Sequence, residues 1–337
     1  MQHYERQTES ETKFMKYRRL GRTNFSVSEI GHGLWGMSGW TGSDDQHSGQ
    51  ALQGAADLGC NFFDTAWAYG QGNSDRLLGQ LISRNPQKRL YAASKIPPMN
   101  QKWPASSAYR YEDVFPEEHV LKHAQLIRAA LGVDSIDLLQ FHVWDDSWAE
   151  NKEWRRTVER LKQEKFIQYF GLSLNRWEPS NGIKAIRTGL VDTVQVIYNI
   201  FDQSPEDELF SVCQEMDIGI IARVPLDEGS LGGKLTPETR FPEGDWRSRY
   251  FGPENLRPTL ERVNALKAIV PDGMTLPEMA LRFILSNPLV STTIAGMRSM
   301  DHVHSNLALS DGTGLKPDLL GTLRQHRWDR DIASWAS

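Results

Sequence analysis

Residues 61–72, NFFDTAWAYGQG, place a short apolar run directly before an acidic residue. The run ends at Asp64, and Tyr69 follows five positions later. A short apolar run bounded by turn residues is typical of a strand that is buried on both faces. The stretch SDRLLGQLISRN, which begins at Ser74, then spaces its leucines as one face of a helix. The segment therefore predicts a strand, a loop and a helix in succession.

The same succession of apolar runs and amphipathic stretches recurs along the whole chain. Strands are predicted at 30–35, 61–64, 90–95, 136–143, 167–174, 193–198, 218–224 and 290–295. Helices are predicted at 74–85, 115–133, 151–164, 180–189, 205–217, 259–270 and 277–286. Eight buried strands that alternate with helices fit a closed (β/α)8 TIM barrel, an α/β fold. An open doubly wound sheet is the main alternative.

Two predicted connections are long, and both leave the C-terminal ends of strands. They are residues 96–115 after the third strand and 225–258 after the seventh. Barrel enzymes build their sites from such loops, although a poorly ordered surface insertion is the alternative interpretation. The segment before the first strand contains Gly21 and predicts a hairpin that closes the bottom of the barrel. We expect a polar N-terminal tail over 1–15 and a single barrel domain over 16–337.

The composition argues against several classes of partner. The 337 residues are 39% hydrophobic and 24% charged, with a formal net charge of -5. A mildly acidic chain disfavours nucleic acid or an anionic membrane as the main partner. No apolar stretch approaches the ~18 residues of a membrane span, and the N-terminus has no signal-peptide core. Cys60 and Cys213 lie in apolar surroundings, as buried thiols do in a reducing compartment. We therefore expect a soluble, cytoplasmic protein.

Polar residues gather at the predicted C-terminal ends of three strands. Asp64 and Tyr69 follow the second strand, Lys95 ends the third, and His142 ends the fourth. Each alone has an ordinary explanation, namely a turn or cap residue, a lysine that reaches solvent, or a core histidine. Closure of the barrel would bring all four together. A buried lysine needs a counter-ion such as Asp64, and its charge lowers the pKa of a nearby tyrosine. Tyr69 could then act as a general acid while His142 orients a carbonyl oxygen.

These motifs resemble the aldo-keto reductase superfamily over about residues 17–328. FFDTAWAYG is similar to the family's strand and loop with Asp and Tyr, SKI to its lysine strand, and QFHVW to its histidine strand. The resemblance implies a (β/α)8 barrel in which Tyr69 is the proton donor. Lys95 would lower the pKa of that tyrosine and would be held by Asp64, while His142 would orient the substrate carbonyl.

The resemblance extends to residues that would bind the nicotinamide of NADPH. YFGLSLN is similar to the family's fifth strand, where Ser173 and Asn175 would bond the carboxamide. The family usually places these two residue types side by side, whereas Leu174 intervenes here. In VQVIYN, Gln195 would bind the same carboxamide and Tyr198 would stack on the ring. Both could equally be structural residues of an ordinary barrel interior.

Two later segments resemble the family's phosphate and adenosine sites. VPLDEGSLGGKL would contact the pyrophosphate, and STTIAGMRSMDHVHSNL would hold the adenosine end. Arg298 would face the 2′-phosphate, since a planar guanidinium suits phosphate, and Asn306 would reach the adenine. His302 departs from the Gln that related members commonly carry. The implied cofactor is NADPH or NADP, with NADH as a weaker alternative, and no metal ion is expected. The residues implied are Leu226, Ser230, Lys234, Gly296, Arg298, His302 and Asn306.

The resemblance implies an NADP(H)-dependent oxidoreductase that reversibly reduces an aldehyde or ketone to the alcohol. A small aldehyde or an open-chain sugar is the expected substrate, and the sequence leaves the oligomeric state open. An aromatic rim and one cation near the strand ends predict the substrate site. Its candidate residues are Trp35, Trp67, Trp144 and Arg223.

Two other functions stay open at this point. The family's potassium-channel β-subunits are a precedent for a nucleotide-binding, redox-sensing auxiliary subunit with little turnover. The other is a barrel isomerase or aldolase that uses Lys95 as a Schiff-base amine. It predicts a substrate adduct that borohydride traps, and no need for nicotinamide. The full set of Asp64, Tyr69, Lys95 and His142 favours carbonyl reduction.

Overall fold

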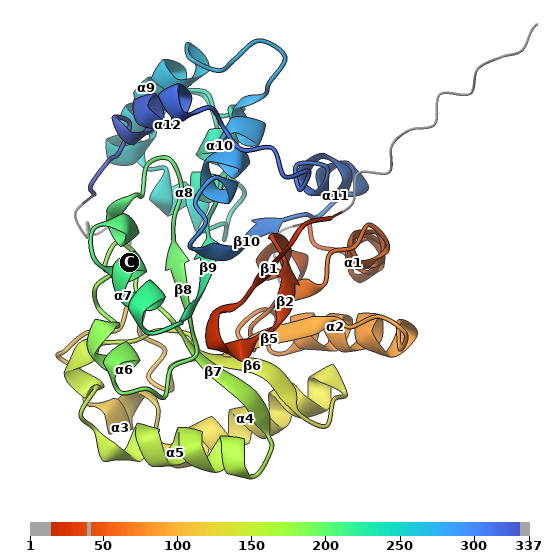
Figure 1. The fold of residues 1–337 in the computed structure, drawn as a ribbon, viewed down its shortest axis with the longest axis vertical. Coiled ribbons are helices and arrows are strands. Elements are labelled where there is room, and N and C mark those ends of the chain that lie inside the picture. The colour runs from red at the N-terminus through yellow and green to blue at the C-terminus, as the bar shows by residue number, and fades with distance from the viewer. Residues whose placement is uncertain (1–14, 39–41, 331–337) are drawn as a thin grey trace, which may run out of the picture.

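The computed structural model describes residues 15–38 and 42–330 of the 337-residue chain. At its centre is a closed barrel of eight parallel strands (Figure 1), in the order β10-β3-β4-β5-β6-β7-β8-β9. The strands are β3 (Ile30–Gly33), β4 (Phe62–Asp64), β5 (Tyr91–Ile96), β6 (Ile136–Phe141), β7 (Ile167–Ser173), β8 (Thr193–Ile197), β9 (Gly219–Arg223) and β10 (Val290–Gly296). The predicted (β/α)8 barrel is confirmed, and every strand lies within about two residues of its predicted bounds, as is usual for element ends.

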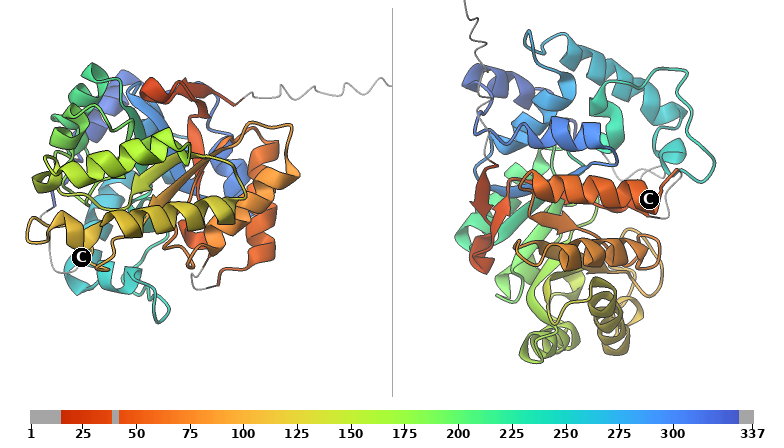
Figure 2. Two further views of the ribbon diagram at one scale, coloured as in Figure 1. Left: turned by 90° about the horizontal axis from the view of Figure 1, so that it is seen from below. Right: turned by 90° about the vertical axis from the view of Figure 1, so that its right-hand side faces the viewer.

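Helices connect the strands and surround the barrel (Figures 1 and 2). They include α1 (Asp45–Asp57), α2 (Asn73–Arg84), α4 (Glu117–Leu131), α5 (Lys152–Gln163), α6 (Ile183–Arg187), α7 (Leu209–Glu215), α9 (Pro253–Lys267), α10 (Leu276–Leu285), α11 (Met300–Leu307) and α12 (Pro317–Arg324). Each predicted helix has a counterpart here, although α6 is shorter than the predicted 180–189. Among the described residues, α1, α11 and α12 have no counterpart in the sequence-based assignment, nor have α3 (Tyr111–Val114) and α8 (Arg247–Tyr250), which lie in the long connections.

A two-stranded hairpin, β1 (Tyr17–Arg19) with β2 (Ser26–Ser28), closes the amino end of the barrel. Gly21 lies in its turn with φ +46°, and a Cβ there would stand 2.2 Å from the backbone nitrogen of Gly219, where β9 begins. Only glycine allows this approach. The hairpin predicted to close the barrel bottom is therefore present. In both views of Figure 2 it lies on the opposite side of the molecule from the segment that follows β9.

The core has two layers, because side chains on each strand alternate between the inside and the outside of the barrel. Phe62 belongs to a small cluster inside the barrel, whereas Phe63 packs outside it, against the helices. Asp64 follows at the inward position, at the carboxyl end of β4. By the same alternation Lys95 follows the inward Ala93. Strand periodicity thus aims both charged side chains into the barrel mouth.

Both long connections carry short helices of their own. The 96–115 connection contains α3 (Tyr111–Val114). The 225–258 connection contains η5 (Asp227–Gly232), α8 (Arg247–Tyr250) and the first residues of α9. Most of the predicted polar tail, residues 1–14, lies outside the described residues. In the part of the chain that is described, no helix is both long enough and apolar enough to cross a membrane.

Candidate active site

A buried ion pair lies at the carboxyl end of the barrel. Lys95 Nζ donates to Asp64 Oδ1 at 2.5 Å and to the carbonyl of Thr65 at 2.8 Å. Neither charged side chain is more than 2% exposed. In the register of the parallel strands β4 and β5, Asp64 lies opposite Ala93, two residues before the lysine. The lysine therefore extends past the end of β4, and its charge is neutralised by the carboxylate.

The second oxygen of Asp64 is also occupied. Gln195 donates to Oδ2 from β8 at 2.7 Å, and Gln140 donates to the same oxygen from β6 at 3.3 Å. Gln195, for which the resemblance implies a bond to the nicotinamide carboxamide, therefore lies in the same cluster as the ion pair. Gln140 was not predicted, although it lies directly opposite Lys95 in the register of β5 and β6. These amides fix the orientation of the carboxylate, and hence that of the lysine it holds.

Tyr69 and His142 lie beside this pair. Lys95 Nζ is 5.3 Å from the centre of the Tyr69 ring, and the Tyr69 and His142 ring centres are 5.7 Å apart. Burial raises the pKa of Tyr69 above its ordinary value near 10, while the charges of Lys95 and Arg223 act in the opposite direction. The lowering effect predicted for Lys95 is present, but desolvation outweighs it in the free protein.

His142 is uncharged at neutral pH in this setting. Burial, followed by the charges of Lys95 and Arg223, lowers its pKa well below 6.5. Its Nδ1 is buried and has no hydrogen-bond partner. The ring of Trp103 packs edge-on against it at 4.6 Å between ring centres. A neutral imidazole can donate one hydrogen bond to a carbonyl oxygen without bringing a second charge.

The residues at the end of β7 lie next to this cluster. Ser173 and Asn175 are both nearly fully buried, whereas Leu174 between them packs in the outer core. The Asn175 amide exchanges two hydrogen bonds with the backbone of Ala105, at 3.0 and 3.1 Å. It therefore ties the loop after β5 to the end of β7. This contact has no signal in the local sequence pattern.

Two of the predicted site residues lie elsewhere. Tyr198 is fully buried, and its hydroxyl donates to Glu206 while its ring packs on Phe210 and Phe283, outside the barrel. It comes one residue after β8 ends, at an outward position, so it cannot stack on a ring held inside the barrel. Trp144 is likewise fully buried in the outer core and donates to Asp146 at 2.8 Å. We therefore leave both residues out of the proposed site.

Arg223 takes the inward position at the end of β9. It follows Ile221, which lies inside the barrel, and its Nη2 donates to the Leu174 carbonyl at 2.9 Å. Its Nε is buried without a hydrogen-bond partner. Burial, with the neighbouring charge of Arg176, lowers the pKa of Arg223 to about 10. The side chain is therefore still cationic at neutral pH.

Aromatic residues surround the opening of the barrel. Trp35 is 39% exposed and contacts the Trp246 ring at 5.9 Å, while Trp103 is 40% exposed. Trp67 is partly buried against His123. Large tryptophan surfaces open to solvent at a barrel mouth provide an apolar wall for a ligand. The sequence places Trp103 among the aromatic residues that follow strand ends, whereas Trp246, in the connection after β9, was not predicted.

The loop after β9 contacts Arg330, the last described residue, which donates to Asp227. Ser230 is fully buried and donates to Asp227 Oδ2 at 2.7 Å. Leu226 is partly buried at the start of η5, and Lys234 is exposed after it. Asp227 and Glu228 both have positive φ, at 44° and 54°. Contacts elsewhere must hold such a strained backbone in place.

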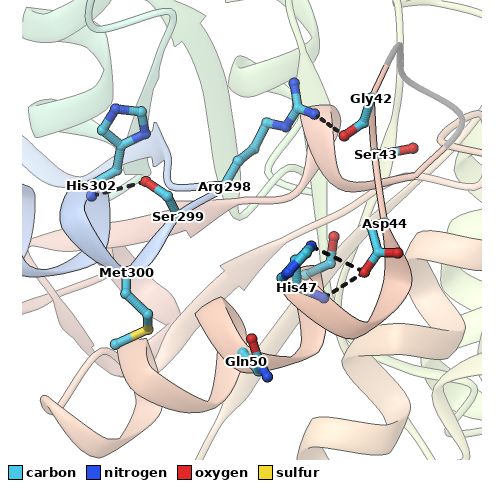
Figure 3. A pocket seen from close by; sticks show the side chains of 10 residues that line it. Gly42, Ser43, Asp44, His47, Gln50, Arg298, Ser299, Met300 and His302 are labelled. Carbon is cyan, nitrogen blue, oxygen red and sulfur yellow. Dashed lines mark hydrogen bonds and ion pairs between the residues drawn. The ribbon is translucent and has the colours of Figure 1, made fainter.

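A pocket of about 510 Å³ lies between the N-terminal ends of α1 and α11 (Figure 3). Arg298, Ser299 and His302 line one side of it, as expected for the adenosine end of a nucleotide site. Arg298 reaches across to donate to the Gly42 carbonyl at 2.8 Å. Asp44 and His47 form the facing wall and are additions to the predicted set. Of the other predicted residues, Gly296 ends β10, and Asn306 is buried in α11.

The side chains fit a nicotinamide nucleotide that spans these two places. At the barrel mouth, buried polar atoms without partners belong to Gln140, His142 and Arg223. Such atoms are rare in proteins and mark where a polar ligand would complete the hydrogen bonding. At the other end, Arg298 and Ser299 offer donors suited to phosphate. Arg223 is one of the three barrel-mouth residues, and the loop that contains Ser230 follows its strand, β9.

The chain is similar to known proteins over most of its length. The aldo/keto reductase family model matches residues 29–327. The oxidoreductase YqkF of Bacillus subtilis is 27% identical, covering 93% of this chain and 96% of its own. The Schizosaccharomyces pombe aldo-keto reductase yakc [NADP(+)] is 28% identical over 88% of each chain. A putative voltage-gated potassium channel subunit beta from the same yeast is 28% identical over 93% of each.

Solved structures show the same fold. The holo form of the aldo-keto reductase AKR11C1 from Bacillus halodurans superposes with a TM-score of 0.75 and 23% identity, covering 96% of this chain and 100% of that one. The family match spans nearly the whole barrel, including the strands that carry Asp64, Lys95 and His142. The chain belongs to the aldo/keto reductase family of oxidoreductases.

Proposed function

We propose that this protein reduces an aldehyde or ketone to the alcohol with NADPH, reversibly, within one barrel domain that begins near residue 16. The observation that carries the proposal is the buried pair of Lys95 and Asp64 beside Tyr69 and a neutral His142. A fully buried ion pair is costly to maintain for stability alone. Its position next to a tyrosine hydroxyl suggests chemistry.

Each residue then has a distinct role. Tyr69 gives a proton to the oxygen of the carbonyl as the alcohol forms. Lys95 lies beside the Tyr69 ring, and its positive charge lowers the pKa of the phenol, in opposition to the effect of burial. Asp64 keeps the lysine in place, and His142 donates a hydrogen bond to the same carbonyl oxygen. General acid catalysis of this kind contributes about 10²–10⁴-fold.

The residues that would hold NADPH are Ser173, Asn175, Gln195, Leu226, Ser230, Lys234, Gly296, Arg298, His302 and Asn306. When bound, the cofactor supplies the hydride that the carbonyl carbon accepts. A relative whose name specifies NADP(+) supports this choice of nucleotide, and so does the guanidinium of Arg298 at the edge of the pocket. NADH would bind more weakly, because it lacks the phosphate.

The substrate site would be formed by Trp35, Trp67 and the partly exposed Trp103 around Tyr69. These rings suit the apolar face of a small aldehyde or of an open-chain sugar. A panel of aldehydes, ketones and sugars, with NADPH oxidation followed by absorbance, tests the activity. We expect turnover of at least one carbonyl compound.

The panel also separates the alternatives. Tight binding of NADPH without turnover of any carbonyl would favour the auxiliary-subunit function that the potassium-channel relative suggests. A substrate adduct at Lys95 trapped by borohydride in the absence of nucleotide would favour a Schiff-base enzyme. The contacts of Lys95 argue against the latter, because its Nζ is fully buried and already donates to the Asp64 carboxylate and the Thr65 carbonyl.

A further inference from the structure

One cation at the carboxyl end of the barrel, Arg223, has no ion-pair partner among the described residues. Lys95 is paired with Asp64, and Arg176 is paired with Glu228 at 2.7 Å. His142 is neutral. Within the described residues no carboxylate lies within ion-pair distance of Arg223, and its guanidinium donates to a backbone carbonyl instead. Its positive charge is therefore not paired locally, although the neighbouring group of Arg330, Asp202 and Asp227 has one more carboxylate than cations.

The charge of Arg223 lies next to the residues that are proposed to bind the nicotinamide. Its Nη2 donates to the carbonyl of Leu174, which lies between Ser173 and Asn175. Its strand, β9, is the direct neighbour of β8, which carries Gln195. These are the residues proposed to bind the carboxamide. The proposed proton donor and substrate rings follow β3, β4 and β5, which are two to four strands from β9 around the barrel, although the charge of Arg223 also acts on Tyr69 and His142.

The backbone next to Arg223 is strained in a way that fixes this placement. Val224 has φ 56°, a conformation that a β-branched residue rarely adopts. The Asn199 side chain holds it by donating to the Val224 carbonyl at 3.0 Å. Strain of this kind persists only where surrounding contacts impose it, and it concentrates at functional sites.

We propose that Arg223 makes this site select the reduced over the oxidised nicotinamide cofactor. This inference rests on the proposed function. The oxidised nicotinamide ring carries one positive charge, whereas the reduced ring carries none, and the rest of the molecule is the same. A fixed cation in a partly desolvated site repels only the oxidised ring. The protein would hold NADPH and release NADP+, so that spent cofactor leaves after each reduction.

The same charge changes the potential of the bound couple. Tighter binding of the reduced form raises the midpoint potential of the bound cofactor relative to the free one. For a two-electron couple, each tenfold difference in affinity corresponds to about 30 mV. The same charge therefore has two effects: NADP+ leaves the site faster, and the bound NADPH is a weaker reductant than free NADPH.

The test compares the affinities of NADPH and NADP+ for the wild type and three variants. Arg223→Gln removes the charge and keeps a hydrogen-bond donor for the Leu174 carbonyl, while Arg223→Lys keeps the charge. Arg257→Gln is a matched control, because that side chain is 87% exposed on α9. Dissociation constants are measured by calorimetry at low and high salt, and thermal melting checks that each variant folds.

We expect the ratio of the NADP+ to the NADPH dissociation constant to fall roughly tenfold in Arg223→Gln, a shift typical of one partly screened charge. Arg223→Lys and Arg257→Gln should keep the wild-type ratio. An unchanged ratio in Arg223→Gln overturns the inference, as does an equal loss of affinity for both forms. A rise in KM confined to anionic carbonyl substrates, with the ratio unchanged, would show that Arg223 binds substrate instead. If the wild type binds neither nucleotide, the proposed function itself fails.

Discussion

Arg330 Nη2 donates to Asp227 Oδ1 at 2.9 Å, although the two residues are 103 positions apart. The guanidinium is 2% exposed and also bonds Asp202 and the hydroxyl of Tyr250, at 2.5 and 2.7 Å. Asp227 begins the turn that contains Ser230, one of the proposed cofactor residues. The last described residue thus ties the loop after β9 to the barrel, and the strained turn in that loop depends on it.

Replacing Arg330 should therefore destabilise the protein. Arg330→Met leaves Asp202 and Asp227 buried and close together without their shared cation. Removing one partner of a buried pair typically costs about 3–5 kcal/mol. Urea unfolding followed by fluorescence measures the change. Arg327→Gln is the matched control, because its partner Asp207 is 57% exposed, and we expect a loss below about 1 kcal/mol. Similar losses in both variants would show that the buried network does not hold the loop.

Tyr69→Phe should keep the cofactor affinity and remove most of the turnover. The ring that packs against His142 remains, but the proton donor is lost. The expected fall in kcat is about 10²–10⁴-fold. Stopped-flow and steady-state assays with a good aldehyde measure it, while nucleotide titration checks binding. A variant that retains a tenth or more of the wild-type kcat would show that another group donates the proton.

Lys95→Met should move the upper limb of the pH–rate profile to higher pH. The charge of Lys95 lowers the pKa of Tyr69, so its removal lets the phenol stay protonated further into the alkaline range. The single variant also leaves Asp64 buried without its cation. The double variant Lys95→Met with Asp64→Asn removes both charges, so it should be more stable than the single one. An unmoved alkaline limb in the single variant would mean that Lys95 does not tune Tyr69.

The strands and the proposed catalytic cluster were predictable because both follow from one pattern. A buried parallel strand is an uninterrupted apolar run, and closure of the barrel brings the residues after such runs together. Asp64 is the last residue of β4 and Lys95 the last but one of the neighbouring β5, so their side chains meet at the same end of the barrel. Helix α1 escaped prediction because most of the residues that it buries are small, among them Ala51, Ala55 and Ala56. Small residues give a weak periodic signal.

The failures at the site have a different physical origin. Tyr198 was assigned to the nicotinamide site from the segment VQVIYN, but successive side chains of a strand point alternately into and out of the barrel. Because β8 has Gln195 facing inward, Tyr198 faces outward. The contact between Arg330 and Asp227 joins two irregular segments far apart in sequence, and no local periodicity encodes it. The strand register and the long-range contacts between loops could be established only from the structure.

Arg298→Ala should weaken NADPH binding by roughly ten- to a hundredfold and leave NADH nearly unaffected. A hydrogen bond to a charged group contributes about 1.5–3 kcal/mol, and each 1.4 kcal/mol is about tenfold in affinity. The lower end is expected, because the side chain is exposed and already donates to the Gly42 carbonyl. Titration of both nucleotides, with Arg257→Ala as the control, measures the effect. Equal losses for NADH and NADPH would mean that Arg298 does not contact the 2′-phosphate.

His32 makes the stability of the fold depend on pH. Its ring is fully buried outside the barrel, stacked on Phe63 at 6.0 Å between ring centres, and neither nitrogen has a hydrogen-bond partner. Burial lowers its pKa from 6.5 to about 4. The unfolded chain therefore binds the proton more tightly than the folded one. Stability from the neutral ring is complete above pH 6.5 and is lost as the pH falls toward 4.

Comparison with His32→Leu isolates this contribution, because every other titrating group is common to both proteins. Leucine fills a similar volume among the same apolar neighbours and binds no proton. Between pH 7.5 and pH 5, the wild type should lose about 2 kcal/mol more unfolding free energy than the variant, from a pKa difference of about 2.5. Urea unfolding at both pH values measures the difference. His304→Gln, an exposed position on α11, should follow the wild type. If His32→Leu loses as much stability as the wild type over this range, the buried imidazole is not the group that titrates.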